Sequence, residues 1–203
     1  MATLLDSGIR GEVLAADPAL GSVQVLVDAG WACIGIRPFM RLWAQPDDAG
    51  AAAATAPEAV PHSEVSCLTE PADLKVAGQI VADAFGRDPD PVMGSTQAGY
   101  HNTSERLVWG LYEAGEMVSC ATTVRVEDTV VLWDVATRPG SQRGGYGKRL
   151  LDAVHARCVD SWNTRQFLLS SSDAGYRLYE SLGYETLAWW QSWSRPRWAF
   201  PAS

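Results

Sequence analysis

The segment at residues 141–154, SQRGGYGKRLLDAV, combines residue types that could hold an anion. The six residues from Arg143 to Lys148 include three glycines and two basic residues, and an apolar pattern of helical period follows at once. A glycine-rich turn that opens a helix leaves backbone N–H groups without helical partners, at the positive end of the helix dipole. Such a turn suits a phosphate or pyrophosphate, whereas the alternative is a turn that serves only packing.

The spacing of the glycines shows which of the known phosphate-binding patterns this segment fits. Lys148 is followed by Arg149, so the pattern GxxxxGK[ST] is absent, and the glycines do not fit GxGxxG. The pattern that fits is [Q/R]xxGx[G/A], with Gln142, Gly145 and Gly147 at its defined positions.

Strands and helices of ordinary length must position this turn. Alternating and apolar runs predict strands at 65–68, 106–113, 116–127, 129–137, 166–170 and 184–193. Apolar stripes of helical spacing predict helices at 72–86, 147–161 and 173–183, and 87–104 is expected to be a loop. The buried face of the first helix is expected to carry Leu74, Val76, Ile80, Val81, Ala84 and Phe85. That of the second is expected to carry Gly147, Leu150, Leu151, Val154 and Cys158. Because strands flank each late helix, we expect an α/β (α+β) fold with a mixed central sheet covered by helices on both faces.

Two segments in this order resemble the GNAT (GCN5-related N-acetyltransferase) superfamily. The segment 135-VATRPGSQRGGYGKRLL-151 is similar to its acetyl-CoA-binding motif, and 174-AGYRLYESLGYE-185 is similar to its A-x-x-x-L-Y-x-x-x-G-F element. The resemblance covers about residues 65–195 and implies the acyl-CoA N-acyltransferase fold, with acetyl-CoA as co-substrate and no metal.

The resemblance also implies a role for individual positions. The strands at 129–137 and 166–170 would splay apart, and the pantetheine arm would enter the gap like an extra strand. Tyr179 would be the general acid that protonates the departing CoA thiolate, although a packed aromatic residue is the alternative. The implied cofactor-binding residues are Val135, Ala136, Thr137, Gln142, Arg143, Gly144, Gly145, Tyr146, Gly147 and Lys148.

The sequence does not assign a general base. Some members of the superfamily carry a glutamate early in the strand where this chain has Val131. Strand alternation would point Asp134, three residues further on, to the opposite face from Val131. The remaining candidates, each readily explained as a surface residue, are Glu113, Glu116, His101 and Asp88.

Residues 1–44 resemble the back end of the same fold. Both 13–43 and 168–193 have the pattern of a strand, a polar turn with Asp, a helix, an aromatic residue and a strand. We therefore expect a partial GNAT-like β-α-β module at 1–44, an Ala/Pro-rich linker at 45–64 and an N-acetyltransferase domain at 65–203. The partial module would dock on the main domain or on a second subunit, and chance similarity is the alternative.

Composition restricts the partners. The net charge of −8 argues against nucleic acid, and no apolar run approaches a membrane span. The four cysteines are spread without metal-like clustering, each in an apolar run, so we expect buried free thiols in a cytoplasmic protein. The acidic chain and the loop at 87–104 would suit a cationic amine. The late tryptophans could line an acceptor pocket, but packing at an edge or in a homodimer is the preferred explanation.

Two functions follow from the resemblance. The first is an acetyl-CoA-dependent N-acetyltransferase, in which a small-molecule or peptide primary amine attacks the thioester directly in a ternary complex. The second is a non-catalytic acyl-CoA-binding sensor or scaffold of the same fold.

Overall fold

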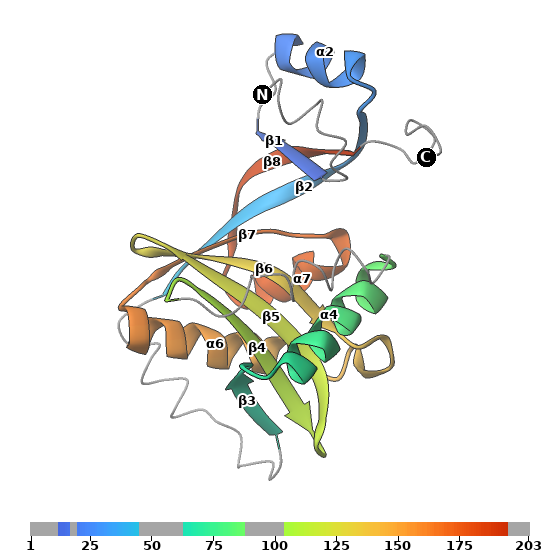
Figure 1. Ribbon diagram of the computed structural model, residues 1–203. Helices are drawn as coiled ribbons and strands as arrows, with labels where there is room; N and C mark the ends of the chain where they lie inside the picture. The colour runs from blue at the N-terminus through green and yellow to red at the C-terminus, as the bar shows by residue number, and fades with distance from the viewer. Residues whose placement is uncertain (1–11, 17–19, 45–62, 88–103, 195–203) are drawn as a thin grey trace. The chain divides into compact units, whose positions relative to one another are not determined.

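The computed structural model describes residues 12–16, 20–44, 63–87 and 104–194 (Figure 1). The early elements are β1 (Glu12–Ala16), α2 (Leu20–Asp28), β2 (Ala32–Trp43), β3 (Ser63–Cys67) and α4 (Pro71–Phe85). The later ones are β4 (Arg106–Glu113), β5 (Glu116–Val126), β6 (Thr129–Thr137), the 3-10 turn η1 (Pro139–Ser141), α6 (Tyr146–Trp162), β7 (Gln166–Ser170), α7 (Asp173–Ser181) and β8 (Glu185–Ser194).

The eight strands follow the order β1-β8-β2-β7-β6-β5-β4-β3 in a mixed sheet. The chain divides into two compact units, and the boundary runs through the late elements. Unit 1 comprises Met1–Met40, Ser170–Glu180 and Glu185–Ser203, and unit 2 comprises Arg41–Leu169 and Ser181–Tyr184. Residues 45–62 of the predicted linker at 45–64 and residues 88–103 of the predicted loop at 87–104 fall outside the described residues. The last two residues of the predicted linker, Ser63 and Glu64, belong to β3.

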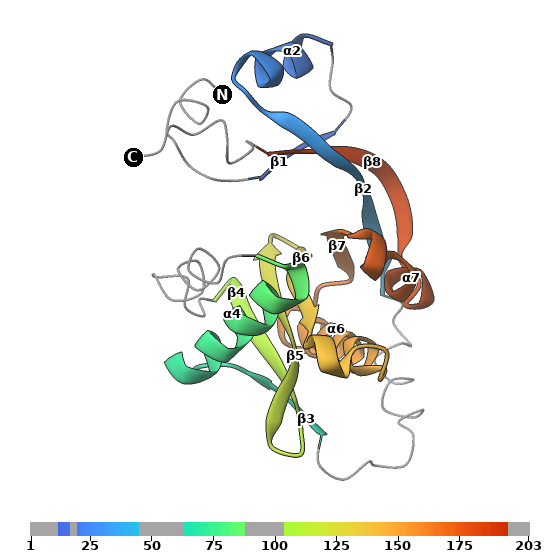
Figure 2. The same cartoon turned by 90° about the vertical axis from the view of Figure 1, so that its right-hand side faces the viewer.

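In unit 2, strands β3 to β6 pair antiparallel in sequence order, and β7 pairs parallel with β6. Helix α4 covers one face of these strands and α6 covers the other, as both views show (Figures 1 and 2). The predicted mixed sheet with helices on both faces is therefore confirmed.

Helix α4 packs on the sheet through small residues as well as large ones. It begins at Pro71, and proline is tolerated in the first turn because an N–H group there would have no helical partner. The helix is terminated by Gly86, which has a φ of 59°. Ala77 and Gly78 are buried beside Leu74 and Ile80. Val76 and Phe85, which the sequence pattern placed on the buried face, are exposed.

Helix α6 packs on the other face through the stripe that the sequence predicted. Leu150, Leu151, Val154 and Cys158 are buried. Their spacing of three and four residues keeps them on one side of the helix, and the first turn of α6 is held against the sheet as a result.

Unit 1 contains the strand–helix–strand order expected for the N-terminal residues. Strand β1 pairs antiparallel with β8, with Glu12 opposite Ser194 and Ala16 opposite Trp190. A small core joins Leu26 of α2 to Trp31 and Trp193. The Phe39 and Trp190 rings stack with centroids 4.1 Å apart, so part of the late tryptophan cluster packs inside this unit.

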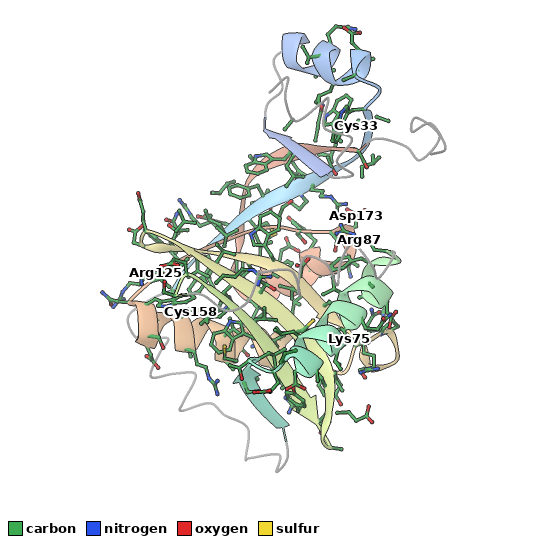
Figure 3. All side chains as sticks on the ribbon, in the orientation of Figure 1. Cys33, Lys75, Arg87, Arg125, Cys158 and Asp173 are labelled. Atoms are coloured by element: carbon green, nitrogen blue, oxygen red, sulfur yellow. The ribbon has the colours of Figure 1, made fainter. Side chains whose placement is uncertain are left out.

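The cysteines match the expectation only in part. All four are free, and Cys120 and Cys158 are buried, but Cys67 is half-buried and Cys33 is exposed (Figure 3). Cys33 precedes the exposed Ile34 in a stretch of β2 that is apolar in sequence but open to solvent, so an apolar run was not a sufficient sign of burial. In the described parts of the chain, no helix is long and apolar enough to cross a membrane.

The packing of unit 2 makes a matched prediction for two valines near one strand turn. Val130 is 0 % exposed, whereas Val126 is 55 % exposed. Val130→Ala should lower the free energy of unfolding by about 2 kcal/mol, because it leaves a cavity in the core. Val126→Ala loses the same β-branched side chain without a cavity and should cost less than about 1 kcal/mol. Urea denaturation of both variants measures this, and equal losses would contradict the packing described.

Candidate functional site

Strands β6 and β7 pair over only part of their length. Thr129, Val130 and Val131 lie opposite Gln166, Phe167 and Leu168. Beyond these pairs β6 continues for six more residues, to Thr137. On the side toward β7, the backbone of the last part of β6 therefore does not pair with that strand. The predicted splay of these two strands requires this.

An irregularity on β6 lies in this unpaired part. Trp133 is opposite Thr122 and Ala136 is opposite Cys120, so Asp134 and Val135 together face the single residue between those two partners. Asp134 takes a left-handed conformation with φ of 50°, which is uncommon for a residue other than glycine.

The bulge changes the direction of the Asp134 side chain. Asp134 interacts electrostatically with Cys120, whose sulfur lies 3.6 Å from the Ala77 carbonyl oxygen of α4. Val131 pairs with Val124, which shares this α4 face with Cys120 by strand alternation. Asp134 and Val131 therefore lie on the same face, and the predicted opposite orientation is wrong, because alternation does not hold across a bulge.

Hydrogen bonds hold the end of β6 in place. The Arg138 amide donates to the Val118 carbonyl oxygen at 2.8 Å, so the amide of Thr137, one residue earlier, points away from β5. The Ser119 hydroxyl donates to the Ala136 carbonyl oxygen at 2.7 Å and lies 2.9 Å from the Thr137 hydroxyl. Ser119 was not among the predicted site residues, although a polar residue inside the apolar run of β5 could have indicated it.

The loop after β6 leads to a helix start without a side-chain cap. Gly145 is the residue before α6, with φ of 80°, and within the described part of the chain no side-chain cap hydrogen bond occurs at this helix start. The first helical bond of this end runs from the Arg149 amide to the Gly145 carbonyl oxygen, so the amides of Tyr146, Gly147 and Lys148 have no helical acceptor. A side-chain carbon at Gly145 would meet nothing within 4 Å, so the space beside this residue is open.

The remaining predicted loop residues surround this helix start. Gln142, Arg143 and Gly144 are exposed, and the Gln142 side-chain amide donates to the Thr137 carbonyl oxygen at 3.3 Å. A side-chain carbon at Gly144 would lie 2.7 Å from the Tyr146 ring, so a larger residue there would require that ring to move. Val135, Ala136 and Thr137 belong to the same unit as the loop, which brings all ten predicted cofactor-binding residues into unit 2.

The cations of the first turn of α6 already have acidic neighbours. The Lys148 ammonium lies 2.7 Å from a carboxylate oxygen of Asp152, and both side chains are exposed. The Arg149 guanidinium lies 3.3 Å from Glu113. An exposed ion pair is worth at most about 1 kcal/mol, so Lys148 can exchange Asp152 for a phosphate at little cost.

Tyr179 is the buried residue of α7, in unit 1. It is 7 % exposed, and burial raises the pKa of its hydroxyl above the ordinary value. The ring packs near Gly175, where a side-chain carbon would lie 3.0 Å from a ring carbon. A raised pKa keeps the hydroxyl protonated at neutral pH, as a general acid requires, and its role at the loop in unit 2 stays a prediction.

The candidate bases differ in their surroundings. Burial raises the pKa of the Asp134 carboxyl, while the charges of Arg87 and Arg106 act in the opposite direction. Glu113 pairs with Arg149, Glu116 is exposed at the start of β5, and His101 and Asp88 lie outside the described residues. Over the described ranges, no group of three or more His, Cys, Asp or Glu residues could hold a metal ion.

A buried histidine of α6 joins this helix to neighbouring elements. The His155 Nε2 atom lies 2.8 Å from the Tyr184 hydroxyl, and the His155 ring contacts Phe167 at a centroid distance of 4.5 Å. Burial lowers the pKa of His155 to about 3, with a smaller contribution from the Lys148 charge. His155 is therefore neutral at physiological pH and positions the helix that carries the loop.

The raised pKa of Tyr179 predicts a loss of stability at high pH. The unfolded tyrosine ionises near pH 10, before the folded one, so the stability contributed by the protonated hydroxyl declines as pH rises from about 10. Tyr179→Phe should flatten this decline, whereas Tyr176→Phe, at a half-buried position on the same helix, should change it less. Urea denaturation between about pH 9 and 11 measures the slopes, and equal slopes for both variants would contradict the burial of the Tyr179 hydroxyl.

Comparisons with known proteins find a family match for part of the chain. Residues 104–186 match a family model described as an acetyltransferase (GNAT) domain. A search of curated proteins finds no match.

Solved structures share the fold at low sequence identity. A GCN5-related N-acetyltransferase from Kribbella flavida is 20 % identical with a TM-score of 0.62, over 91 % of this chain and 67 % of its own. A GNAT-family acetyltransferase, described as putative, from Novosphingobium aromaticivorans is 18 % identical with a TM-score of 0.58, over 96 % and 80 %. A predicted acetyltransferase from Clostridium acetobutylicum, solved with acetyl-CoA, is 15 % identical with a TM-score of 0.52, over 61 % and 90 %. The match to the acetyltransferase (GNAT) domain model covers the unpaired end of β6, the uncapped start of α6 and Tyr179.

Proposed function

We propose that the protein is an acetyl-CoA-dependent N-acetyltransferase that moves an acetyl group to a primary amine. The observation that carries the proposal is that unit 2 contains both the end of β6 that does not pair with β7 and the uncapped start of α6. The end of β6 offers backbone groups to the extended, amide-containing pantetheine arm. The start of α6 offers three backbone amides to a pyrophosphate. The acetyl-CoA in the similar Clostridium structure supports the same donor.

The residues present fit the donor chemically. The amide of Thr137 points toward the side that β7 has left and can donate to the pantetheine arm. The amides of Tyr146, Gly147 and Lys148, with the Lys148 ammonium beside them, can hold the pyrophosphate. The negative charge of the chain does not oppose this, because the anion site is formed by local donors.

The transfer can proceed by direct attack in a ternary complex. The amine first loses a proton, and its nitrogen then forms a bond to the thioester carbonyl carbon. The C–S bond breaks, the CoA thiolate takes the proton of the Tyr179 hydroxyl, and a proton from the new amide nitrogen restores the tyrosine through solvent. Burial keeps Tyr179 protonated until that step.

Donor binding is tested by a glycine substitution with a matched control. Gly145→Glu should weaken acetyl-CoA binding by at least about tenfold, because a carboxylate would stand at the start of α6 in place of the phosphate. Gly30→Glu introduces the same charge at another glycine with positive φ and open space, in the turn before β2, and should leave the affinity unchanged. Isothermal titration at up to about millimolar acetyl-CoA measures both, and undiminished binding by Gly145→Glu would contradict the donor site.

The acid role is tested on turnover. Tyr179→Phe should lower kcat by about 10² or more, with acetyl-CoA affinity unchanged, because only the proton donor is removed. Tyr176→Phe on the same helix should stay near the wild-type rate. Release of the CoA thiol over a panel of primary amines measures the rate. An unaffected rate in Tyr179→Phe would refute the acid role, and tight donor binding without turnover on any amine would refute the transferase.

A further inference from the structure

Ser119 carries a fully buried hydroxyl beside the end of β6, and the proposed transfer does not use it. Its side chain is 0 % exposed. The hydrogen bond from the Arg138 amide to Val118 marks a hydrogen-bonded position of the antiparallel ladder. The neighbouring pair, Thr137 and Ser119, is therefore of the kind in which side chains approach most closely. A buried hydroxyl lowers stability unless it forms hydrogen bonds, and Ser119 forms two.

The two hydrogen bonds of Ser119 have a fixed direction. A serine hydroxyl has a single proton, and that of Ser119 is donated to the Ala136 carbonyl oxygen at 2.7 Å. The Thr137 hydroxyl lies 2.9 Å from the Ser119 oxygen and is therefore the donor of the second bond. The result is a chain of hydrogen bonds that runs from Thr137 through Ser119 to the carbonyl of Ala136, and the members of such a chain strengthen one another.

This chain ends on the peptide group that joins Ala136 to Thr137. The group is planar and trans, so its C=O and N–H point in opposite directions. Because the Ser119 hydroxyl of β5 holds the oxygen, the Thr137 N–H is directed to the other side, where the pairing of β6 with β7 has already ended. In an ordinary sheet the next strand would hold this N–H. Here Ser119 fixes its direction from the opposite side.

We propose that Ser119 is a positioning residue for donor binding, which acts through this peptide group. It fixes the direction of the Thr137 N–H and, by polarising the peptide, makes that group a stronger donor to a carbonyl oxygen of the pantetheine arm. Since the N–H is in place before the ligand arrives, binding requires no reordering of the end of β6. The proposal rests on the proposed function and adds to its donor site a side chain to which the family resemblance assigned no role.

A purely structural role is the alternative, and Thr123 offers a matched control for it. Thr123 lies on the same strand, four residues after Ser119, and is also 0 % exposed. Its hydroxyl donates to the Leu107 carbonyl oxygen of β4 at 3.3 Å and accepts from the Trp109 Nε1 atom at 2.9 Å. Both partners belong to β4, on the side of β5 that faces away from β6. Loss of either hydroxyl removes a buried hydrogen bond to the backbone, but only that of Ser119 reaches the edge where the arm would bind.

The test compares two ligands that differ in the arm. Acetyl-CoA contains it, whereas 3′-phosphoadenosine 5′-diphosphate contains the pyrophosphate without it. Ser119→Ala should weaken acetyl-CoA binding by about fivefold or more, because the arm loses a fixed and polarised donor. Binding of the nucleotide should not change, because the start of α6 is unaltered. Isothermal titration measures both dissociation constants.

Two further variants separate positioning from packing. Ser119→Cys fills nearly the same space with a poor hydrogen-bond donor, so it should show the same loss for acetyl-CoA without a cavity. It also decides the matter alone if Ser119→Ala does not fold. Thr123→Val should bind both ligands as the wild-type protein does, although it loses a hydroxyl that is equally buried.

Every result of these titrations has a defined meaning. A loss for acetyl-CoA alone in the Ser119 variants, which Thr123→Val does not share, supports the proposal. Unchanged acetyl-CoA binding in Ser119→Cys, an equal loss for the nucleotide, or an equal loss in Thr123→Val overturns it and leaves the proposed donor site standing. Wild-type protein that does not bind acetyl-CoA would instead refute the proposed function itself.

Discussion

The separation of β6 from β7 is the constraint on which the rest of the site depends. The backbone donors and acceptors of a strand inside a sheet normally form hydrogen bonds with both neighbouring strands. A buried backbone group without a hydrogen-bond partner lowers the stability of the fold. Here the parallel pairing ends at Val131 and Leu168, while β5 continues to pair with β6 as far as Thr137. The remaining edge of β6 is held rigidly on one side and can receive an extended ligand on the other.

The surrounding residues keep that edge in position. Ser119 fixes the carbonyl of Ala136, and the buried stripe of α6 holds the helix start in the same unit. Asp134 adopts a left-handed conformation within the bulge, which costs about 1–3 kcal/mol for a residue without special support. A strained residue next to an unpaired edge is typical of functional positions, and here the strain turns a carboxylate onto the face where the exposed Trp133 lies.

The sequence predicted most of the regular structure of unit 2. The bounds of β4, β6 and β7 agree with the expected strands, because each run is apolar and is flanked by turn residues. The glycine pattern before α6 was recognisable because its spacing reflects the backbone conformation needed at Gly145. These features are local, and local rules suffice for them.

Features that depend on pairing between distant segments were not predictable in this way. A bulge adds one residue to β6 only relative to β5, so no property of residues 129–137 alone reveals it, and the side of Asp134 was inferred wrongly. The two-unit division joins residues 1–40 to segments from 170 onward, which a reading along the chain cannot detect. Ala77 and Gly78 face the sheet because it approaches α4 closely, whereas the hydrophobic pattern favoured the larger Val76 and Phe85.

Backbone amide exchange is the most direct test of the claim that the edge of β6 and the start of α6 bind one ligand. Residue-resolved hydrogen exchange, followed by NMR, would be compared with and without acetyl-CoA. The account predicts that the amides of Thr137, Gly147 and Lys148 become protected together, at the same ligand concentration, while those of the β4–β5 turn at Ala114 and Gly115 do not change. Protection of the loop without Thr137, or of neither, would contradict it.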